Sequence, residues 1–193
     1  EDNAGYLWAG TKEGLARINI ETREFGFFQH DPTDPQSLSN SVVRCVFQDS
    51  QGRIWIGTDG GGLNLAHFSE DRVIFTHYVN DPSNAASISS NMVFSIWEDE
   101  TGMLWLGTYG GELNYFNPET EEFCHYSEKD GLSNNVIYGV LGDDQNNLWL
   151  STNRGLSKFN LNTRNFRVYE QNDGLQSNEF NVGAYYKSRR GEL

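Results

Sequence analysis

The sequence is poor in basic residues and cysteines, and it contains no long hydrophobic run. Only 14 lysines and arginines stand against 27 aspartates and glutamates, which gives a net charge of −13. An acidic surface repels phosphate backbones, so nucleic acid is disfavoured as a partner. Two cysteines are too few for a disulfide framework. No stretch approaches the roughly 18 apolar residues of a membrane span, so we expect no membrane contact by this segment.

A repeated tryptophan motif organises the chain. Gly-Tyr-Leu-Trp-Ala-Gly-Thr at 5–11 returns in similar form at 52–58, 102–108 and 146–152. The tryptophans recur at intervals of 44 to 50 residues, which fits β-propeller blades of roughly 40–50 residues. The sequence therefore predicts an all-β propeller over 1–193 with about four four-stranded antiparallel blades, and repeat units of roughly 1–49, 50–99, 100–143 and 144–193.

The two ends of the chain are out of phase with this repeat. Glu1-Asp2 aligns with the end of an inner strand, so the first blade is expected to lack its innermost strand. Residues 179–186 align with an inner strand, and 191–193 align with the start of the next second strand. The first residue is Glu1 rather than Met, which favours excision or processing from a longer protein. We expect a fragment of a larger ring, with closure on the first blade as the alternative.

The motif Gly-x-Leu-Trp-[Ile/Leu]-Gly-Thr-x-Gly-Gly-x-Leu-Asn at 52–64 and 102–114 resembles the two-component regulator propeller repeat. The element Asp-Pro-x-x-x-x-Ser-[Leu/Ile]-Ser at 31–39 and 81–89, before two inner strands, resembles the same family. The resemblance implies a seven-bladed ring in the periplasmic sensing part of a membrane-bound hybrid histidine kinase or diguanylate cyclase. It also implies a downstream β-sandwich, a signalling domain elsewhere in the parent protein, and oligosaccharides as the ligand class.

On that resemblance, the expected function is non-catalytic sensing without a cofactor. Any kinase or cyclase activity would then lie outside this chain. The alternative function is a protein–protein scaffold that binds no small molecule. A propeller lyase or glycosidase is a third alternative, but it needs converging acid and base residues in the channel, and the repeats offer no such set.

The repeated residues themselves are expected to serve the fold. Trp8, Trp55, Trp105 and Trp149 recur at one strand position and are predicted to fill the core between blades rather than to stack on sugars. The glycines at 10, 57 and 107 are predicted to allow close packing of adjacent sheets.

A binding site must break this symmetry, so we look for it where the copies differ. One variable slot directly follows the threonine of the second strand and holds Lys12, Asp59, Tyr109 and Asn153. The other lies on the inner strand and holds Arg44, Phe94, Tyr138 and Asn181. Aromatic faces beside amide and charged groups suit a carbohydrate or a small polar ligand. The competing interpretation is that both slots are unconstrained surface.

Other reactive side chains are expected to have no chemical role. Cys45 is predicted to be a buried small residue, and Cys124 is predicted to lie far from it on an outer strand. His77 and His125 share one outer-strand slot, so they should diverge around the ring instead of binding one metal ion. The acidic turns near 49 and 99 have ordinary hairpin chemistry and lack the spacing of a calcium loop.

Overall fold

The computed structural model describes residues 1–69, 72–188 and 190–191. Within those residues the secondary structure consists of β-strands and two short 3-10 helices. The elements are β1 (Tyr6–Gly10), β2 (Leu15–Asn19), β3 (Phe25–Phe28), β4 (Val43–Gln48), β5 (Ile54–Thr58), β6 (Leu63–Phe68), β7 (Val73–Tyr78), β8 (Val93–Glu98), β9 (Leu104–Thr108), β10 (Leu113–Asn117), β11 (Glu122–Tyr126), η1 (Glu128–Asp130), β12 (Ile137–Gly142), β13 (Asn147–Thr152), β14 (Leu156–Asn160), β15 (Phe166–Tyr169) and η2 (Gln171–Asp173).

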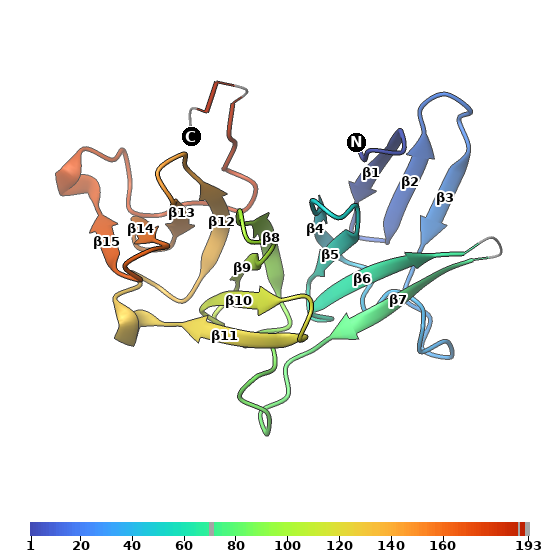
Figure 1. The fold of residues 1–193 in the computed structure, drawn as a ribbon, viewed down its shortest axis with the longest axis horizontal. Coiled ribbons are helices and arrows are strands. Elements are labelled where there is room, and N and C mark those ends of the chain that lie inside the picture. The colour runs from blue at the N-terminus through green and yellow to red at the C-terminus, as the bar shows by residue number, and fades with distance from the viewer. Residues whose placement is uncertain (70–71, 189, 192–193) are drawn as a thin grey trace.

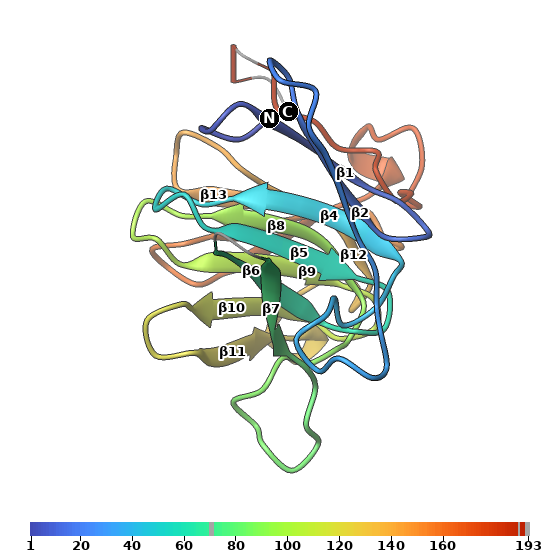
Figure 2. The same ribbon diagram turned by 90° about the vertical axis from the view of Figure 1, so that its right-hand side faces the viewer.

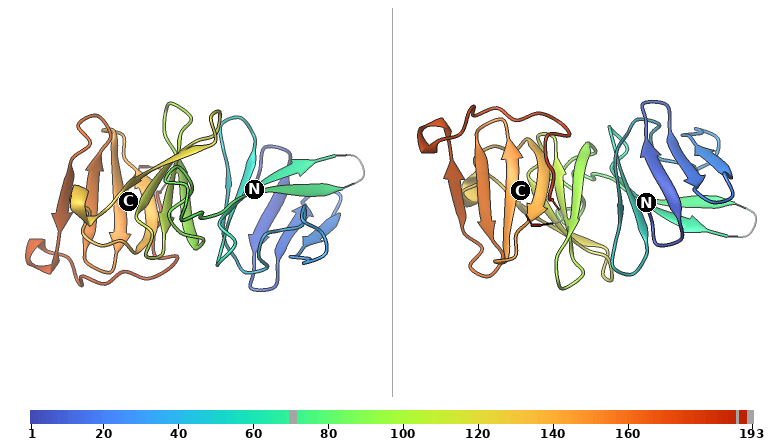
Figure 3. Two further views of the ribbon diagram at one scale, coloured as in Figure 1. Left: turned by 90° about the horizontal axis from the view of Figure 1, so that it is seen from below. Right: turned by 90° about the horizontal axis from the view of Figure 1, so that it is seen from above.

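The strands form four antiparallel sheets that follow one another in an arc (Figure 1). The sheets are β1–β3, β4–β7, β8–β11 and β12–β15, each in sequence order. Strand β8 lies between β4 and β12 on the inner side of the arc, and the loop between β7 and β8 projects away from the sheets (Figure 2). Views along the vertical axis show the sheets side by side as successive blades (Figure 3). The predicted β-propeller architecture is confirmed.

The first blade lacks an inner strand, as the alignment predicts. Its sheet has only β1, β2 and β3, whereas each of the other three sheets has four strands. Asp2 N donates to Tyr6 O at 2.8 Å, and this bond matches that from Asp49 N to Arg53 O in the next blade. The chain therefore enters the first blade at the turn that follows the inner strand in the other blades. Each later repeat unit defined from the sequence thus begins one strand after the start of the corresponding sheet.

The predicted inner strand at 179–186 is wrong. Phe180 N donates to Thr152 O at 3.1 Å, as Val43 N donates to Thr11 O at 2.8 Å, so this segment begins as the inner strands do. Beyond Phe180 it turns and forms no strand. An inner strand pairs only with the second strand of its own blade, and the described residues provide no second strand here. Of the second strand expected at 191–193, Gly191 lies in a bend, and 192–193 lie outside the described residues.

The repeated tryptophans tie each blade to its turn, and in the first three blades they also pack against the following blade. The indole Nε1 of Trp55 donates to Asp49 Oδ2 at 2.8 Å, and the Trp55 ring packs edge-on against Phe116 of the next blade at 5.6 Å. Trp105 likewise donates to Asp99 Oδ2 at 2.9 Å. Trp55 and Trp105 are fully buried, which confirms their predicted role in the core, whereas Trp8 and Trp149 are only half-buried.

The glycine two residues after the tryptophan of the motif sets the spacing between blades. A Cβ added at Gly57 would lie 2.8 Å from the Val93 carbonyl oxygen, and one at Gly107 would lie 3.0 Å from the Ile137 carbonyl oxygen. Both contacts are shorter than van der Waals separation, so only glycine allows the next inner strand to approach this closely. The predicted packing role is confirmed, and in the fourth blade Ser151 stands at this position.

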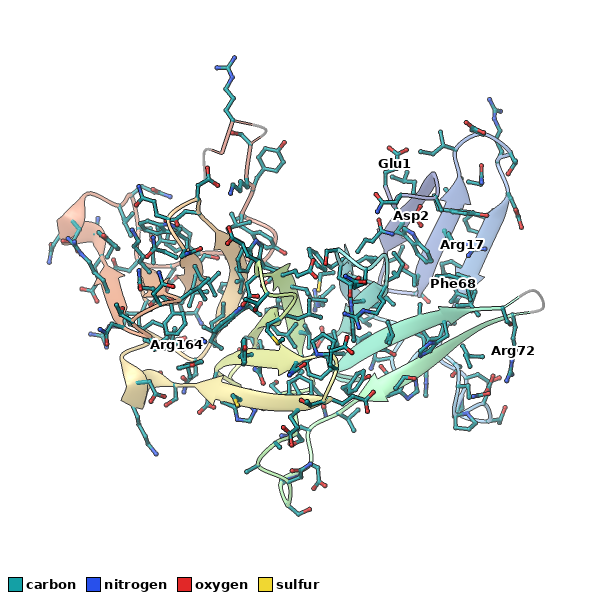
Figure 4. All side chains as sticks on the ribbon, viewed as in Figure 1. Glu1, Asp2, Arg17, Phe68, Arg72 and Arg164 are labelled. Atoms are coloured by element: carbon teal, nitrogen blue, oxygen red, sulfur yellow. The ribbon has the colours of Figure 1, made fainter. Side chains whose placement is uncertain are left out.

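Arginines reinforce the aromatic layers between blades. The Arg17 guanidinium lies 4.5 Å from the Tyr6 ring centroid and 5.4 Å from that of Phe68 in the next blade. Arg164 of the fourth blade lies 5.4 Å from the Trp105 ring centroid in the third. Figure 4 shows Arg17 beside Phe68 and shows Arg164 at the opposite end of the arc. These cation–π contacts use the charge of a basic side chain to hold neighbouring sheets together.

Candidate functional site

Each complete blade begins its inner strand with a β-bulge. In β4, Val43 pairs with Thr58 and Cys45 pairs with Gly57, so Arg44 has no partner residue in β5. Phe94 in β8 and Tyr138 in β12 are skipped in the same way. A bulge redirects the side chain of the extra residue, and bulges are frequent beside binding sites. The sequence slot that varies among inner strands is therefore the bulge position.

The three bulge side chains meet across the boundaries between blades. The Arg44 guanidinium lies 5.6 Å from the Phe94 ring centroid. On the other side, the Phe94 and Tyr138 rings are stacked with centroids 5.8 Å apart and an interplanar angle of 17°. The second, third and fourth blades thus contribute one side chain each to a continuous row.

The side chains of the variable slot that follows each second strand contact the three bulge side chains. Arg44 donates through Nε to Asp59 Oδ2 at 3.0 Å and also pairs with that oxygen through Nη2. Tyr109 packs edge-on against Phe94 at 5.9 Å, and Tyr138 Oη donates to Asn153 Oδ1 at 2.9 Å. We call the two rows together the interblade strip, and it comprises Arg44, Phe94, Tyr138, Asp59, Tyr109 and Asn153.

The strip combines a buried centre with accessible edges. Phe94 is 6% exposed, whereas Tyr109 is 49% exposed and Asn153 is also exposed. Arg44 and Asp59 neutralise each other, and their side chains are 32% and 21% exposed. Within the described residues, Arg44 Nη1, the Tyr109 hydroxyl and the Asn153 amide nitrogen have no hydrogen-bond partner. The strip can therefore offer aromatic surface, donors and acceptors to a polar ligand without presenting a net charge.

Six of the eight predicted site residues are thus brought together, and two are not. Lys12 is exposed on the first blade, and its ammonium group contacts no hydrogen-bond or ion-pair partner among the described residues. Asn181 lies in the C-terminal segment, where its carbonyl oxygen accepts from Ala184 N at 3.2 Å in a turn. Both lie one blade beyond the three complete sheets, where the repeat is interrupted.

Cys124 has the location predicted for it, whereas Cys45 is half-buried and not fully buried as predicted. Cys45 packs against Gly57, and burial raises the pKa of its thiol to about 12, which disfavours the reactive thiolate. Cys124 is exposed on β11, and both cysteines are free.

The two outer-strand histidines contribute to the fold. His77 Nε2 contacts the Ser37 carbonyl oxygen at 2.7 Å, and His125 Nε2 contacts the Ser87 carbonyl oxygen at 2.8 Å. Each ring holds the loop that enters its blade, so the two histidines lie in different blades as predicted. Among the described residues, no three histidine, cysteine or acidic side chains group into a metal site.

Sequence reasoning missed two features of this region. It recognised the variable slot but not the bulge that redirects it, because a bulge depends on strand register and leaves no distinct residue pattern here. It also missed Tyr185, whose hydroxyl donates to the Phe94 carbonyl oxygen at 3.3 Å. The only signal for Tyr185 was Gly139, which takes the place of Cys45 and Ser95 in the fourth blade and leaves room for a ring.

Comparison with known proteins identifies the class to which this arc of blades belongs. The family model described as "Two component regulator propeller" matches residues 37–60 and 131–154. Each match spans an entering loop, an inner strand and a second strand, and together they include four strip residues. The chain thus contains two stretches that match two-component regulator propeller repeats.

The relatives are much longer than this chain. Histidine kinase P4 of Formosa agariphila is 35% identical over 185 residues, which is 94% of this chain and 13% of that protein. The extracellular domain of a hybrid two component system from B. thetaiotaomicron is 27% identical with a TM-score of 0.72, covering 86% of this chain and 22% of that one. The extracellular domain of a one component system from the same organism is 26% identical with a TM-score of 0.73, covering 87% and 24%. Both of these solved relatives are extracellular domains. In the described part of this chain, no helix is long and apolar enough to cross a membrane.

Proposed function

We propose that this chain is a non-catalytic, ligand-binding portion of a sensor in a membrane-bound two-component signalling protein, located in the periplasm. The interblade strip is the proposed ligand site, and an oligosaccharide is the proposed ligand. The observation that carries the proposal is the convergence of six variable side chains from three blades, since packing alone requires only the repeated positions. The extracellular location of the solved relatives supports a sensory role outside the cytoplasm.

The chemistry of the strip favours sugars over anions. Sugar rings stack their apolar C–H faces on aromatic side chains, and their hydroxyl groups both donate and accept hydrogen bonds. Tyr109 supplies an exposed ring, and Asn153 and Arg44 supply free N–H groups. Asp59 already neutralises Arg44, so an anion would have to displace a carboxylate that the strip holds by two hydrogen bonds.

Calorimetric titration with neutral and acidic tetrasaccharides tests this proposal. The probes are tetrasaccharides of glucose and of galacturonic acid, titrated into the intact parent sensor with and without Tyr109→Ala. Loss of one stacking aromatic is expected to weaken binding of the preferred probe by about tenfold. Tyr186→Ala is the matched control, because Tyr186 is 73% exposed and lies outside the strip. Equal affinities for the wild type and both variants would exclude the strip as the ligand site.

A second candidate function is protein association through the open face of the first blade. Leu7, Phe25 and Phe27 on this face are 47%, 61% and 42% exposed. The corresponding side chains of the next blade, Ile54 and Phe75, are buried against the blade before it. We propose that further blades of a larger, seven-bladed ring cover this face. Phe25→Ser with Phe27→Ser tests this coverage: placing polar groups under further blades should lower the unfolding midpoint of the intact sensor, and an unchanged midpoint would argue against coverage of this face.

A further inference from the structure

We propose that the interblade strip is selective for N-acetylated amino sugars, and that Met92 contacts the methyl group of the acetamido substituent. This selectivity rests on the function proposed above and names the class of sugar that the strip prefers. Met92 is an exposed apolar residue at the boundary between the second and third blades, and it lies directly beside two strip residues.

Met92 lies between Asp59 of the second blade and Tyr109 of the third. Asp59 and Met92 form an isolated antiparallel bridge across the boundary between the two blades. On the other side, Tyr109 N donates to Met92 O at 3.1 Å, and this contact continues the pairing of Val93 with Thr108. Side chains of directly opposed residues project to the same side of a sheet, with Cβ atoms about 4.5–5.5 Å apart. Asp59, Met92 and Tyr109 therefore present three adjacent side chains.

Met92 differs from its counterparts in the other complete blades. Val42 and Val136 occupy the same position in the second and fourth blades, and both are half-buried. Met92 is 37% exposed, so part of its apolar surface stays in contact with water. A methionine side chain is unbranched and polarizable, and it adapts to an apolar group placed against it. Because a shorter valine satisfies the packing of the other blades, the exposed part of Met92 is available for a contact outside the chain.

An unused acceptor and an unused donor lie beside Met92. Both hydrogen bonds from Arg44 go to Asp59 Oδ2, which leaves Asp59 Oδ1 and Arg44 Nη1 without a hydrogen-bond partner among the described residues. The carboxylate oxygen can accept from an N–H group of a ligand, and the guanidinium nitrogen can donate to a carbonyl oxygen. The charge pair thus offers one acceptor and one donor next to an apolar surface.

An acetamido group has the complementary set of atoms. Its N–H group, carbonyl oxygen and methyl group match Asp59 Oδ1, Arg44 Nη1 and Met92 respectively. A hydroxyl group at the same sugar carbon can bond to either polar atom, but it leaves the methionine uncovered. The exposed Tyr109 ring stacks on the sugar ring in both cases. The strip should therefore distinguish an acetamido sugar from the same sugar with a hydroxyl group.

Calorimetric titration of the intact parent sensor with chitotetraose and cellotetraose tests this selectivity. The two probes have the same rings and linkages, and they differ only in carrying an acetamido group or a hydroxyl group. Chitotetraose is expected to bind about tenfold more tightly, because it adds one hydrogen bond and buries one methyl group. Met92→Ala is expected to reduce this preference to about threefold and to leave the affinity for cellotetraose unchanged. Met103→Ala is the matched control, because the only other methionine lies at the Asp99 turn, outside the strip.

Tyr109→Ala separates this selectivity from the function on which it rests. Ring stacking does not depend on the acetamido group, so this change should weaken both probes by about tenfold and preserve their ratio. Equal affinities for the two probes, or a full preference for chitotetraose in Met92→Ala, would overturn the selectivity. Binding that still depends on Tyr109 would then support the strip as a site for other sugars.

Two further outcomes would also overturn the selectivity. Tetra-alanine carries amide and methyl groups without a sugar ring, and binding as tight as that of chitotetraose would show that the strip recognises a peptide. Binding of neither tetrasaccharide would exclude N-acetylated amino sugars as well. The proposed sugar-binding function itself would fail only if the tetrasaccharide of galacturonic acid did not bind either.

Discussion

Removing the Asp49 carboxylate is expected to destabilise the chain far more than removing its equivalent in the first blade. Asp49 is 2% exposed and accepts from Trp55 Nε1 at 2.8 Å, from Arg53 N at 2.8 Å and from Arg53 Nε at 2.6 Å. In Asp49→Ala the buried indole N–H and the Arg53 amide lose their acceptor. Each buried donor left unsatisfied costs about 1–3 kcal/mol, so the free energy of unfolding should fall by roughly 2–6 kcal/mol.

Asp2→Ala is the matched control. Asp2 accepts from the corresponding groups, Trp8 Nε1 at 2.7 Å and Tyr6 N at 2.8 Å, but it is only half-buried. Water can replace the carboxylate there, so the loss should be about 0.5–1.5 kcal/mol. Urea unfolding followed by tryptophan fluorescence and circular dichroism measures both values. Equal losses in the two variants would refute the claim that burial of the bond between tryptophan and the turn holds the inner blades together.

Three further predictions follow from the fold. Acid should destabilise the chain through Asp143. Burial raises the pKa of this carboxyl, but hydrogen bonds from Trp149 and Asn147 outweigh burial and hold the pKa below its ordinary value. The carboxylate therefore stabilises the fold at pH values above the unfolded pKa, and this stabilisation is lost as pH falls through the folded pKa. Asp143→Asn should flatten the pH dependence of urea unfolding below about pH 4, and an unchanged slope would contradict this. Gly107→Ala should lower stability by about 1–3 kcal/mol, because its Cβ would press on Ile137, and a melting temperature equal to that of the wild type would disprove the close approach. A thiol reagent should label the exposed Cys124 faster than the half-buried Cys45 in the folded chain, because burial raises the pKa of the Cys45 thiol; equal labelling rates would contradict this.

The sequence was sufficient to predict the blades because their packing repeats. Trp55 and Trp105 lie in the same environment, so the same residue types recur at the same spacing. The missing inner strand of the first blade was also visible, since Glu1-Asp2 aligns with a known point of the repeat. These features depend on local pattern alone.

The failures occurred where neighbours decide the structure. Residues 179–186 were expected to form an inner strand, but a strand needs a partner, and the segment turns onto Gly139 instead. The variable slots include Arg44 and Tyr138, yet only strand register reveals that both are bulge residues. Lys12 was included on its alignment alone, and nothing in its own sequence indicated that the strip would begin one blade later.

The most direct test of the central claim is an amide chemical-shift titration of the ¹⁵N-labelled chain with the tetrasaccharide that binds best. The largest shifts are expected at the strip residues. Shifts concentrated on the open face of β1–β3, or the absence of shifts at the strip under saturating ligand, would contradict it.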